Sequence, residues 1–191
     1  MPRTYSALYR FMHWSIALCM TLLLITIFLR TTWMNKDHVA NIIQQHMTDA
    51  GTPLPRDQAI VLAKQIRAPM WDWHIYLGYT LVGLFTLRMA LAPLGRMALP
   101  NPFRQQLSRK EQFQFAVYLV FYVGVAVSLI TGLLIEWGPR DLHEAAEEVH
   151  VLSIYYLLTF IVLHLGGVLL AEFTDEQGLV SRIVSGARRA A

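Results

Sequence analysis

Four of the seven histidines lie within or at the edge of long apolar stretches of the chain: His13, His74, His150 and His164. An ionisable side chain in such a stretch is costly to bury and usually marks a functional site. The neutral imidazole nitrogen is also the commonest protein ligand of transition metals. These four side chains are therefore the candidate ligands of a metal or of a metal-containing cofactor.

The spacing of the histidines predicts two separate pairs. His150 and His164 are fourteen residues apart. On a helix this is about 3.9 turns and about 21 Å, so the two side chains share nearly one face at different depths. If successive spans cross the membrane in opposite directions, His74 and His150 lie at the same membrane surface, which we call the outer one. We therefore expect these two to form the outer pair. His13 lies at the opposite end and is the expected inner partner of His164.

A pair of imidazoles on one iron makes a six-coordinate haem, which favours electron transfer over oxygen binding. Helical bundles commonly hold such cofactors between facing helices. Zinc normally takes four ligands, and each level offers two histidines without an obvious carboxylate. The sequence thus predicts two haems b, with His13 and His164 as ligands of the inner iron. His74 and His150 are the expected ligands of the outer iron. The alternative for each histidine alone is hydrogen bonding across helices. Four glycines beside the ligands leave room for a flat macrocycle or for close helix contact: Gly78, Gly83, Gly166 and Gly167.

Two arginines near the inner level are candidate partners for haem propionates. Arg10 lies one turn before His13, and Arg88 lies near the inner end of the second apolar stretch. The planar guanidinium matches the geometry of a carboxylate. The alternative role for these arginines is anchoring at the membrane surface. At the outer level the candidates are Arg30 and Arg67.

The elements that carry these residues are long enough to cross a bilayer, because about 20 helical residues span its hydrocarbon core. The apolar stretches are residues 11–29, 75–94, 113–135 and 149–171. The chain is 55% hydrophobic and 15% charged, whereas soluble domains carry about 25% charged residues. We expect an all-α fold, a bundle of four transmembrane helices, because helices of a soluble bundle would show a polar stripe.

The charge and cysteine content exclude several other classes of protein. The net charge of +3, without a long basic run, excludes nucleic acid as a partner. Cys19 is the single cysteine, so the chain has no disulfide framework and no cysteine-based metal site.

Residues 34–70 form an insertion between the first two apolar stretches. It is too long for a bare loop, and Val39, Ile43 and Met47 recur at near-helical spacing. Residues 56–67 are predicted to form a second short helix. We expect a small helical cap on the outer, periplasmic face.

The distribution of basic residues predicts the orientation of the chain. With four spans, ten of the sixteen lysines and arginines lie on the side of the two termini. These are Arg3, Arg10, Arg88, Arg96, Arg104, Arg109, Lys110, Arg182, Arg188 and Arg189. Because positive charge accumulates in the cytoplasm, we expect both termini there, in a bacterial inner-membrane protein.

The motifs RFMHW (10–14), WH (73–74) and H-x13-H (150–164) give the chain a resemblance to known proteins. It resembles the bacterial cytochrome b561 family and the b-type cytochrome subunits of nickel–iron hydrogenases and formate dehydrogenases. The likeness implies a single di-haem domain over residues 1–191, with the same two histidine pairs. The tail 175–189 is similar to the tail of hydrogenase-type members, whereas the insertion at 34–70 departs from the short members.

The resemblance implies an electron-transfer subunit or quinone oxidoreductase component that works between an outer redox partner and the membrane quinone pool. Expected partners are the lipid bilayer, ubiquinone or menaquinone, and a periplasmic c-type cytochrome or metalloenzyme subunit; a second copy of the chain is also a candidate. A first alternative is a superoxide:quinone oxidoreductase, although the acidic outer loop argues against capture of an anion. A second alternative is a haem-free membrane scaffold or metal transporter.

Overall fold

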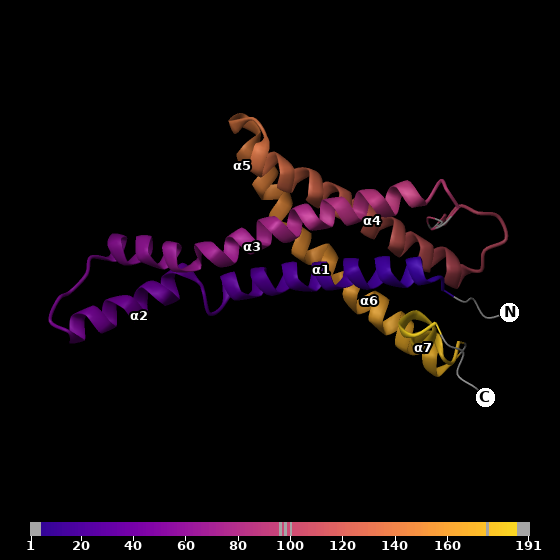
Figure 1. Ribbon diagram of the computed structural model, residues 1–191, viewed down its shortest axis with the longest axis horizontal. Helices are drawn as coiled ribbons and strands as arrows, with labels where there is room; N and C mark the ends of the chain where they lie inside the picture. Colours follow the sequence, from indigo (N-terminus) through magenta and orange to yellow (C-terminus); the bar gives the residue numbers. More distant parts are fainter. Residues whose placement is uncertain (1–4, 96, 98, 100, 175, 187–191) are drawn as a thin grey trace. The chain divides into compact units, whose positions relative to one another are not determined.

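The computed structural model describes residues 5–95, 97, 99, 101–174 and 176–186. All regular structure in these residues is helical (Figure 1), which confirms the predicted all-α class. The helices are α1 (Ala7–Thr31), α2 (Lys36–Asp49), α3 (Arg56–Leu91), α4 (Arg109–Trp137), α5 (Arg140–Val151), α6 (Ser153–Phe173) and α7 (Leu179–Val184). The chain divides into two compact units: Met1–Ser15 with Leu84–Ala191, and Ile16–Gly83.

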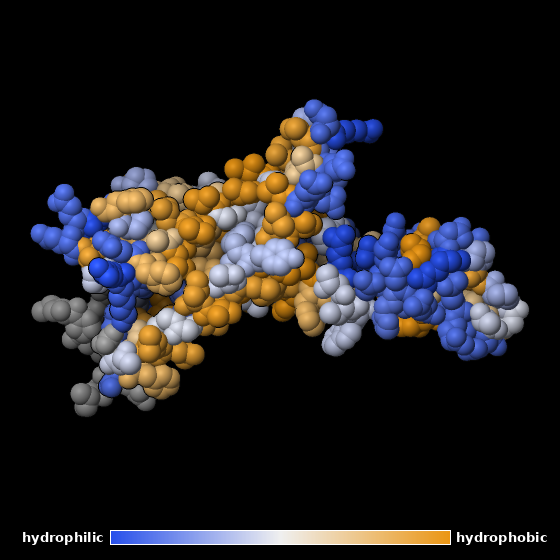
Figure 2. Space-filling view, turned by 180° about the vertical axis from the view of Figure 1, so that it is seen from behind, coloured by the Kyte–Doolittle hydropathy of each residue, from blue (hydrophilic) through white to orange (hydrophobic). Residues whose placement is uncertain are grey.

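Four helical stretches are long and apolar enough to cross a membrane: Ala7–Thr31, Arg56–Leu91, Arg109–Trp137 and Arg140–Phe173. Large hydrophobic side chains on them are exposed, such as Leu18, Val120 and Val162, the last at 70%. The four long helices are mostly orange in Figure 2, whereas α2 and the first turns of α3 are mostly blue. Exposed apolar surface on this scale suits lipid rather than water. The chain is therefore a multi-pass membrane protein, as predicted.

The third helix differs from its prediction. Residues 56–67 and the second apolar stretch are one continuous helix of 36 residues, so the prediction of a separate short helix was wrong. Pro69 lies inside α3. A proline removes one backbone donor and bends a helix, but it does not end the helix when the residues on both sides favour helix. No glycine occurs between Arg56 and His74 to stop it.

The fourth span is longer than predicted and is interrupted once. Helix α5 already begins at Arg140, and α6 ends at Phe173. At the junction, the Leu152 N–H donates to the Val149 carbonyl (3.2 Å), and the Tyr155 N–H donates to the Leu152 carbonyl (3.1 Å). These i to i−3 bonds tighten the helix for one turn. The interruption lies between His150 and His164, so the two histidines are on different helices.

In the unit Ile16–Gly83, helix α2 packs against the first turns of α3. Its core is made of three alanines that are 0% exposed: Ala40, Ala59 and Ala63. Small side chains at the contact allow two helices to approach closely. Asn35 caps α2 by accepting hydrogen bonds from the N–H groups of Asp37 and His38. Residues 36–49 and 56–67 are therefore helical, the latter as the first turns of α3, and the periplasmic location of this segment stays a prediction.

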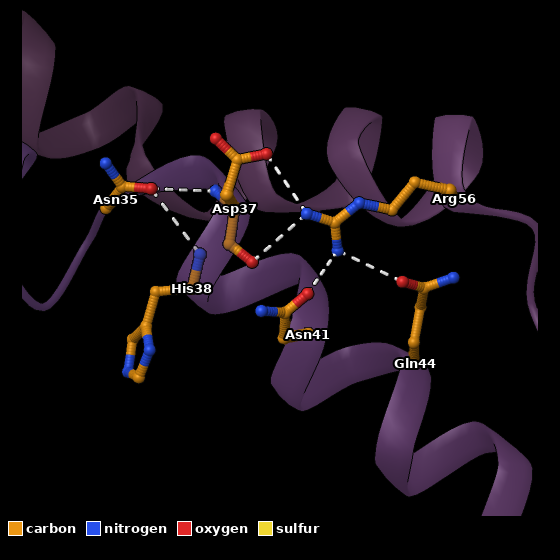
Figure 3. A network of polar contacts seen from close by, with 6 residues as sticks. All are labelled: Asn35, Asp37, His38, Asn41, Gln44 and Arg56. Carbon is orange, nitrogen blue, oxygen red and sulfur yellow. Dashed lines mark hydrogen bonds and ion pairs between the residues drawn. The ribbon is translucent and has the colours of Figure 1, made fainter.

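Arg56, the first residue of α3, ties this helical hairpin together (Figure 3). Its guanidinium donates to Asn41 Oδ1 (2.5 Å) and Gln44 Oε1 (3.0 Å), and forms an ion pair with Asp37 Oδ1 (3.0 Å). Exposed pairs of this kind contribute little to stability. The contacts instead set the register between α2 and α3.

In the other unit, α4 packs against α5 and α6, and α7 folds back on α6. Glu172, near the end of α6, accepts hydrogen bonds from the N–H groups of Gly178 and Val180 (2.9 Å each). The Trp14 indole N–H donates to the Ile183 carbonyl (3.1 Å), which joins α7 to the start of α1. The C-terminal turn thus covers the inner end of α1.

Four of the ten basic residues on the side of the two termini are not described by the structure. Arg3, Arg96, Arg188 and Arg189 lie outside the described residues. The placement of both termini in the cytoplasm stays a prediction.

The alanine contact predicts the effect of a larger side chain. Replacement Ala63→Leu puts three extra carbons into a fully buried contact, and we expect the hairpin to lose about 1–3 kcal/mol of stability. Thermal unfolding and limited proteolysis of the purified protein in detergent measure this loss. Val61→Leu on the exposed face of α3 is the control, since Val61 is 54% exposed. Equal sensitivity of the two variants would contradict the alanine contact.

Candidate functional site

The two inner histidines are adjacent in the structure. His13 on α1 and His164 on α6 belong to the same unit, and their ring centroids are 6.1 Å apart with the planes tilted by 51°. All four candidate ligands are half-buried, whereas His38, His46 and His143 are exposed. Burial therefore separates the four candidates from the remaining histidines.

The separation of His13 and His164 can be compared with that of two ligands of one metal ion. An imidazole nitrogen binds a metal at about 2.0–2.1 Å, and the ring centre lies about 1.2 Å behind it, so two opposite ligands have ring centres about 6.4 Å apart. The observed 6.1 Å is close to this value. The two rings therefore fit the donor set of a haem iron with two axial histidines.

Aromatic rings surround the inner pair. Phe160 stacks on His164 with centroids 5.3 Å apart and planes within 11°. Trp14 presents its edge to His13 at 5.4 Å. The Tyr118 hydroxyl lies 3.4 Å from His164 Nδ1, which is long for a hydrogen bond to a hydroxyl. The inner rings are therefore held mainly by packing.

The candidate ligand on α3, His74, is held by a threonine and a tryptophan of its own unit. His74 Nδ1 lies 2.7 Å from Thr26 Oγ1 on α1, and Thr26 is buried. Trp71 stacks on the imidazole with centroids 4.7 Å apart and planes within 4°. The guanidinium of Arg30 covers Trp71 at 4.2 Å. This ring is thus restrained at its edge and on one face.

The candidate ligand His150 contacts α4 at Ser128, Thr131 and Gly132. Its Nδ1 lies 3.0 Å from the Ser128 carbonyl oxygen and 3.1 Å from Thr131 Oγ1. A methyl group added at Gly132 would lie 3.1 Å from His150 Cε1, so the glycine lets the ring approach the helix. His74 and His150 belong to different units, and their pairing stays a prediction.

His164 and His150 contact helix α4 at two different positions along its axis. His164 contacts Tyr118 and His150 contacts Ser128. These two residues of α4 are ten positions apart, or about 15 Å along the axis. Between the levels the packing is aromatic: Phe121 stacks on Phe160 at 3.6 Å. Both histidines of the fourth span therefore contact α4, at two different depths.

The two predicted propionate partners have other contacts. Arg88 is buried and donates to the Met97 carbonyl (2.7 Å), with its guanidinium 5.7 Å from the Tyr122 ring centre. The guanidinium of Arg10 lies directly against Gly186, which has φ +74° and no side chain. Its Nε is buried without a hydrogen-bond partner among the described residues. The propionate role of both arginines stays a prediction.

A second buried arginine was not predicted from the sequence as a propionate partner. Arg182 on α7 is 6% exposed. It donates to the Gln177 carbonyl (3.0 Å) and forms an ion pair with Glu176 (3.3 Å). Its Nε is also buried and unpartnered within the described residues. Arg182 thus adds a third guanidinium to the unit that contains Arg10 and Arg88, and its charge is paired with that of Glu176.

The glycines fall into two groups. At the four predicted from the sequence, which are Gly78, Gly83, Gly166 and Gly167, an added Cβ would meet no described atom within 4 Å. At Gly124 and Gly132, which were not predicted, it would press on Tyr156 and His150. Open space at the first group is compatible with a macrocycle, whereas Gly124 and Gly132 let a side chain approach α4 closely.

Other residues of the site also had no signal in the sequence. Thr26 and Thr131 contact histidines that are 48 and 19 positions away in the chain. A threonine in an apolar helix is common, so only the tertiary contact distinguishes them. Among the described residues no cluster of three or more His, Cys, Asp or Glu side chains could hold a separate metal ion.

Comparison with known proteins agrees with this geometry. The family model described as prokaryotic cytochrome b561 matches residues 4–186, nearly the whole chain. No curated protein and no solved structure matches the chain significantly. Members of the matched family are membrane cytochromes that bind haem b and transfer electrons. With its membrane-spanning helices and the adjacent pair His13 and His164, this chain belongs to the prokaryotic cytochrome b561 family.

Proposed function

We propose that the protein conducts electrons through the membrane between two haems b at different depths. His13 and His164 hold the inner haem, and His74 and His150 hold the outer one. The observation that carries this proposal is the 6.1 Å separation of the inner imidazoles on helices α1 and α6. Two half-buried imidazoles without a nearby carboxylate fit haem iron better than zinc.

The outer pair is supported by the contacts of its ring nitrogens. Histidines that bind metals usually engage their second nitrogen with a protein group, which orients the ring. His74 Nδ1 is next to Thr26 Oγ1, and His150 Nδ1 is next to the Ser128 carbonyl. In both residues Nε2 is then the nitrogen for iron.

The residues of the chain position the cofactors and exclude water. When bound, haem supplies the one-electron chemistry, which protein side chains lack. Met12 and Met97 are at most 2% exposed and keep water from the inner level. Arg10 and Arg88 lie at the inner end, where their positive charges would attract the negatively charged haem propionates.

The proposed route joins a periplasmic redox partner to the quinone pool. The outer helix α5 presents four exposed carboxylates, Asp141, Glu144, Glu147 and Glu148. This acidic surface complements a basic partner such as a c-type cytochrome or a metalloenzyme subunit. Quinone, which dissolves in the bilayer, exchanges electrons with a haem at the lipid boundary. Both termini are placed in the cytoplasm.

Single substitutions of the histidines test the pairing. The purified protein is expected to contain about two haems per chain, and each His→Ala variant about one. His13→Ala and His164→Ala lose the same haem, while His74→Ala and His150→Ala lose the other. The pyridine haemochrome and redox titration of the α-band measure content and identity.

The exposed histidines of α2 supply the control for this series. His38→Ala and His46→Ala retain both haems, because both side chains lie on the surface. Loss of haems in any other combination, or a colourless wild-type preparation, would refute the assignment.

The close approach at Gly132 provides an independent test of the His150 site. Replacement Gly132→Ala puts a methyl group 3.1 Å from His150 Cε1, so the ring must move by a few tenths of an ångström. We expect roughly 10-fold weaker retention of the outer haem, as for other changes beside a metal ligand. The inner haem is the internal control. Equal loss of both haems would show a general folding defect instead.

Electron exchange with quinone is tested directly in proteoliposomes. We expect a short-chain ubiquinol or menaquinol to reduce the oxidised haems, which increases the α-band absorbance. Dithionite gives the total reducible haem in the same sample. Full reduction by dithionite with none by either quinol would exclude the quinone pool as the redox partner.

A further inference from the structure

The hydrogen of the Thr26 hydroxyl is already committed to the backbone. Thr26 Oγ1 donates to the Leu23 carbonyl at 2.6 Å. A hydroxyl has one hydrogen, and two oxygens this close need that hydrogen between them. Toward His74, 2.7 Å away, Thr26 can therefore only accept. His74 Nδ1 carries the hydrogen, and Nε2 carries the lone pair.

The same reasoning determines the state of His150. A backbone carbonyl can only accept, so the 3.0 Å contact with Ser128 places the hydrogen on His150 Nδ1. Thr131 Oγ1 donates to the Val127 carbonyl at 2.8 Å. It too presents only a lone pair to His150, at 3.1 Å. In both outer histidines Nδ1 thus carries a hydrogen, so Nε2 is the nitrogen that would bind iron.

The inner histidines have weaker partners. Among the described residues, His164 Nδ1 has its hydrogen-bond contact with the Tyr118 hydroxyl, at a long distance of 3.4 Å. The described contacts of His13 are with aromatic and imidazole rings. Hydrogen bonding to the second nitrogen raises the basicity of a metal-binding histidine. A more basic ligand favours ferric over ferrous iron and lowers the reduction potential.

We propose that Thr26 and Thr131 are positioning residues that fix the tautomer of the outer haem ligands and lower the reduction potential of that haem. Thr131 has the smaller effect, because His150 keeps the Ser128 carbonyl as an acceptor when Thr131 is replaced. The shift favours electron movement from the outer haem toward the inner one. The inference rests on the proposed outer haem, and the experiment below separates the two.

The test compares variants of equal size by redox titration in detergent. Thr26→Val keeps the shape of the side chain but removes the acceptor. We expect the preference of the outer haem site for ferric iron to fall about 10-fold, which is a positive shift of about 59 mV for a one-electron couple. The inner haem is unchanged. Thr131→Val shifts the outer potential in the same direction by less than half as much.

Two controls distinguish the hydroxyl from the general effects of mutation. Thr26→Ser keeps the oxygen and retains the wild-type potential. Thr21→Val removes a hydroxyl on the same helix that donates to the Ala17 carbonyl at 2.8 Å, and it leaves both potentials unchanged. Low-temperature EPR of the ferric haems gives a second readout: only the Thr26→Val and Thr131→Val variants change the g-values of the outer haem.

Each outcome bears on the inference. Loss of the outer haem in Thr26→Val with retention in Thr26→Ser supports it, because the two variants differ in the hydroxyl. Loss in both variants overturns it, as does an outer potential in Thr26→Val that is unchanged, lowered or matched by Thr21→Val. If His74→Ala kept both haems, the proposed outer site itself would fail. If the histidine series held and Thr26→Val had no effect, the threonine inference alone would fail.

Discussion

The need to satisfy imidazole nitrogens inside an apolar medium constrains the rest of this structure. A polar nitrogen in hydrocarbon without a partner costs several kcal/mol. Each ring has one nitrogen that a protein group can engage and one that a metal can bind. At His74 and His150 the first nitrogen contacts hydroxyl and carbonyl oxygens of neighbouring helices. Binding of iron would satisfy the second, so that a bound cofactor and the helix packing would stabilise each other.

Different kinds of contact hold the histidine rings at the two levels. Near the inner histidines the contacts are ring to ring, with Phe160 stacked on His164 and on Phe121. Near the outer histidines hydrogen bonds from Nδ1 are added to the stacking of Trp71 on His74. Aromatic packing restricts where a ring lies, whereas a hydrogen bond also decides which nitrogen is protonated. Two haems with the same ligands can therefore differ in potential without any change of axial residue.

The two compact units are stabilised by different contacts. The α2 hairpin is held by small buried alanines and by the exposed network around Arg56. In the other unit, Arg88 and Arg182 are buried and bonded to backbone carbonyls. A buried guanidinium keeps its charge and is stable only with several acceptors. The carbonyl oxygens of Met97 and Gln177 supply acceptors of this kind.

The sequence by itself determined the membrane spans, the all-α class and the four candidate ligands. Apolar length and residue type are local properties, and a rise of 1.5 Å per residue converts position in a helix into depth. The depth of His13 and His164 also predicted their proximity, but the tertiary structure alone decided how their rings are oriented, that Thr26 contacts His74 and that Gly132 lets His150 approach α4. It also showed that α3 continues through Pro69. These features depend on how each helix is rotated about its axis and on which side chains meet across helices, and no single segment of sequence contains that information.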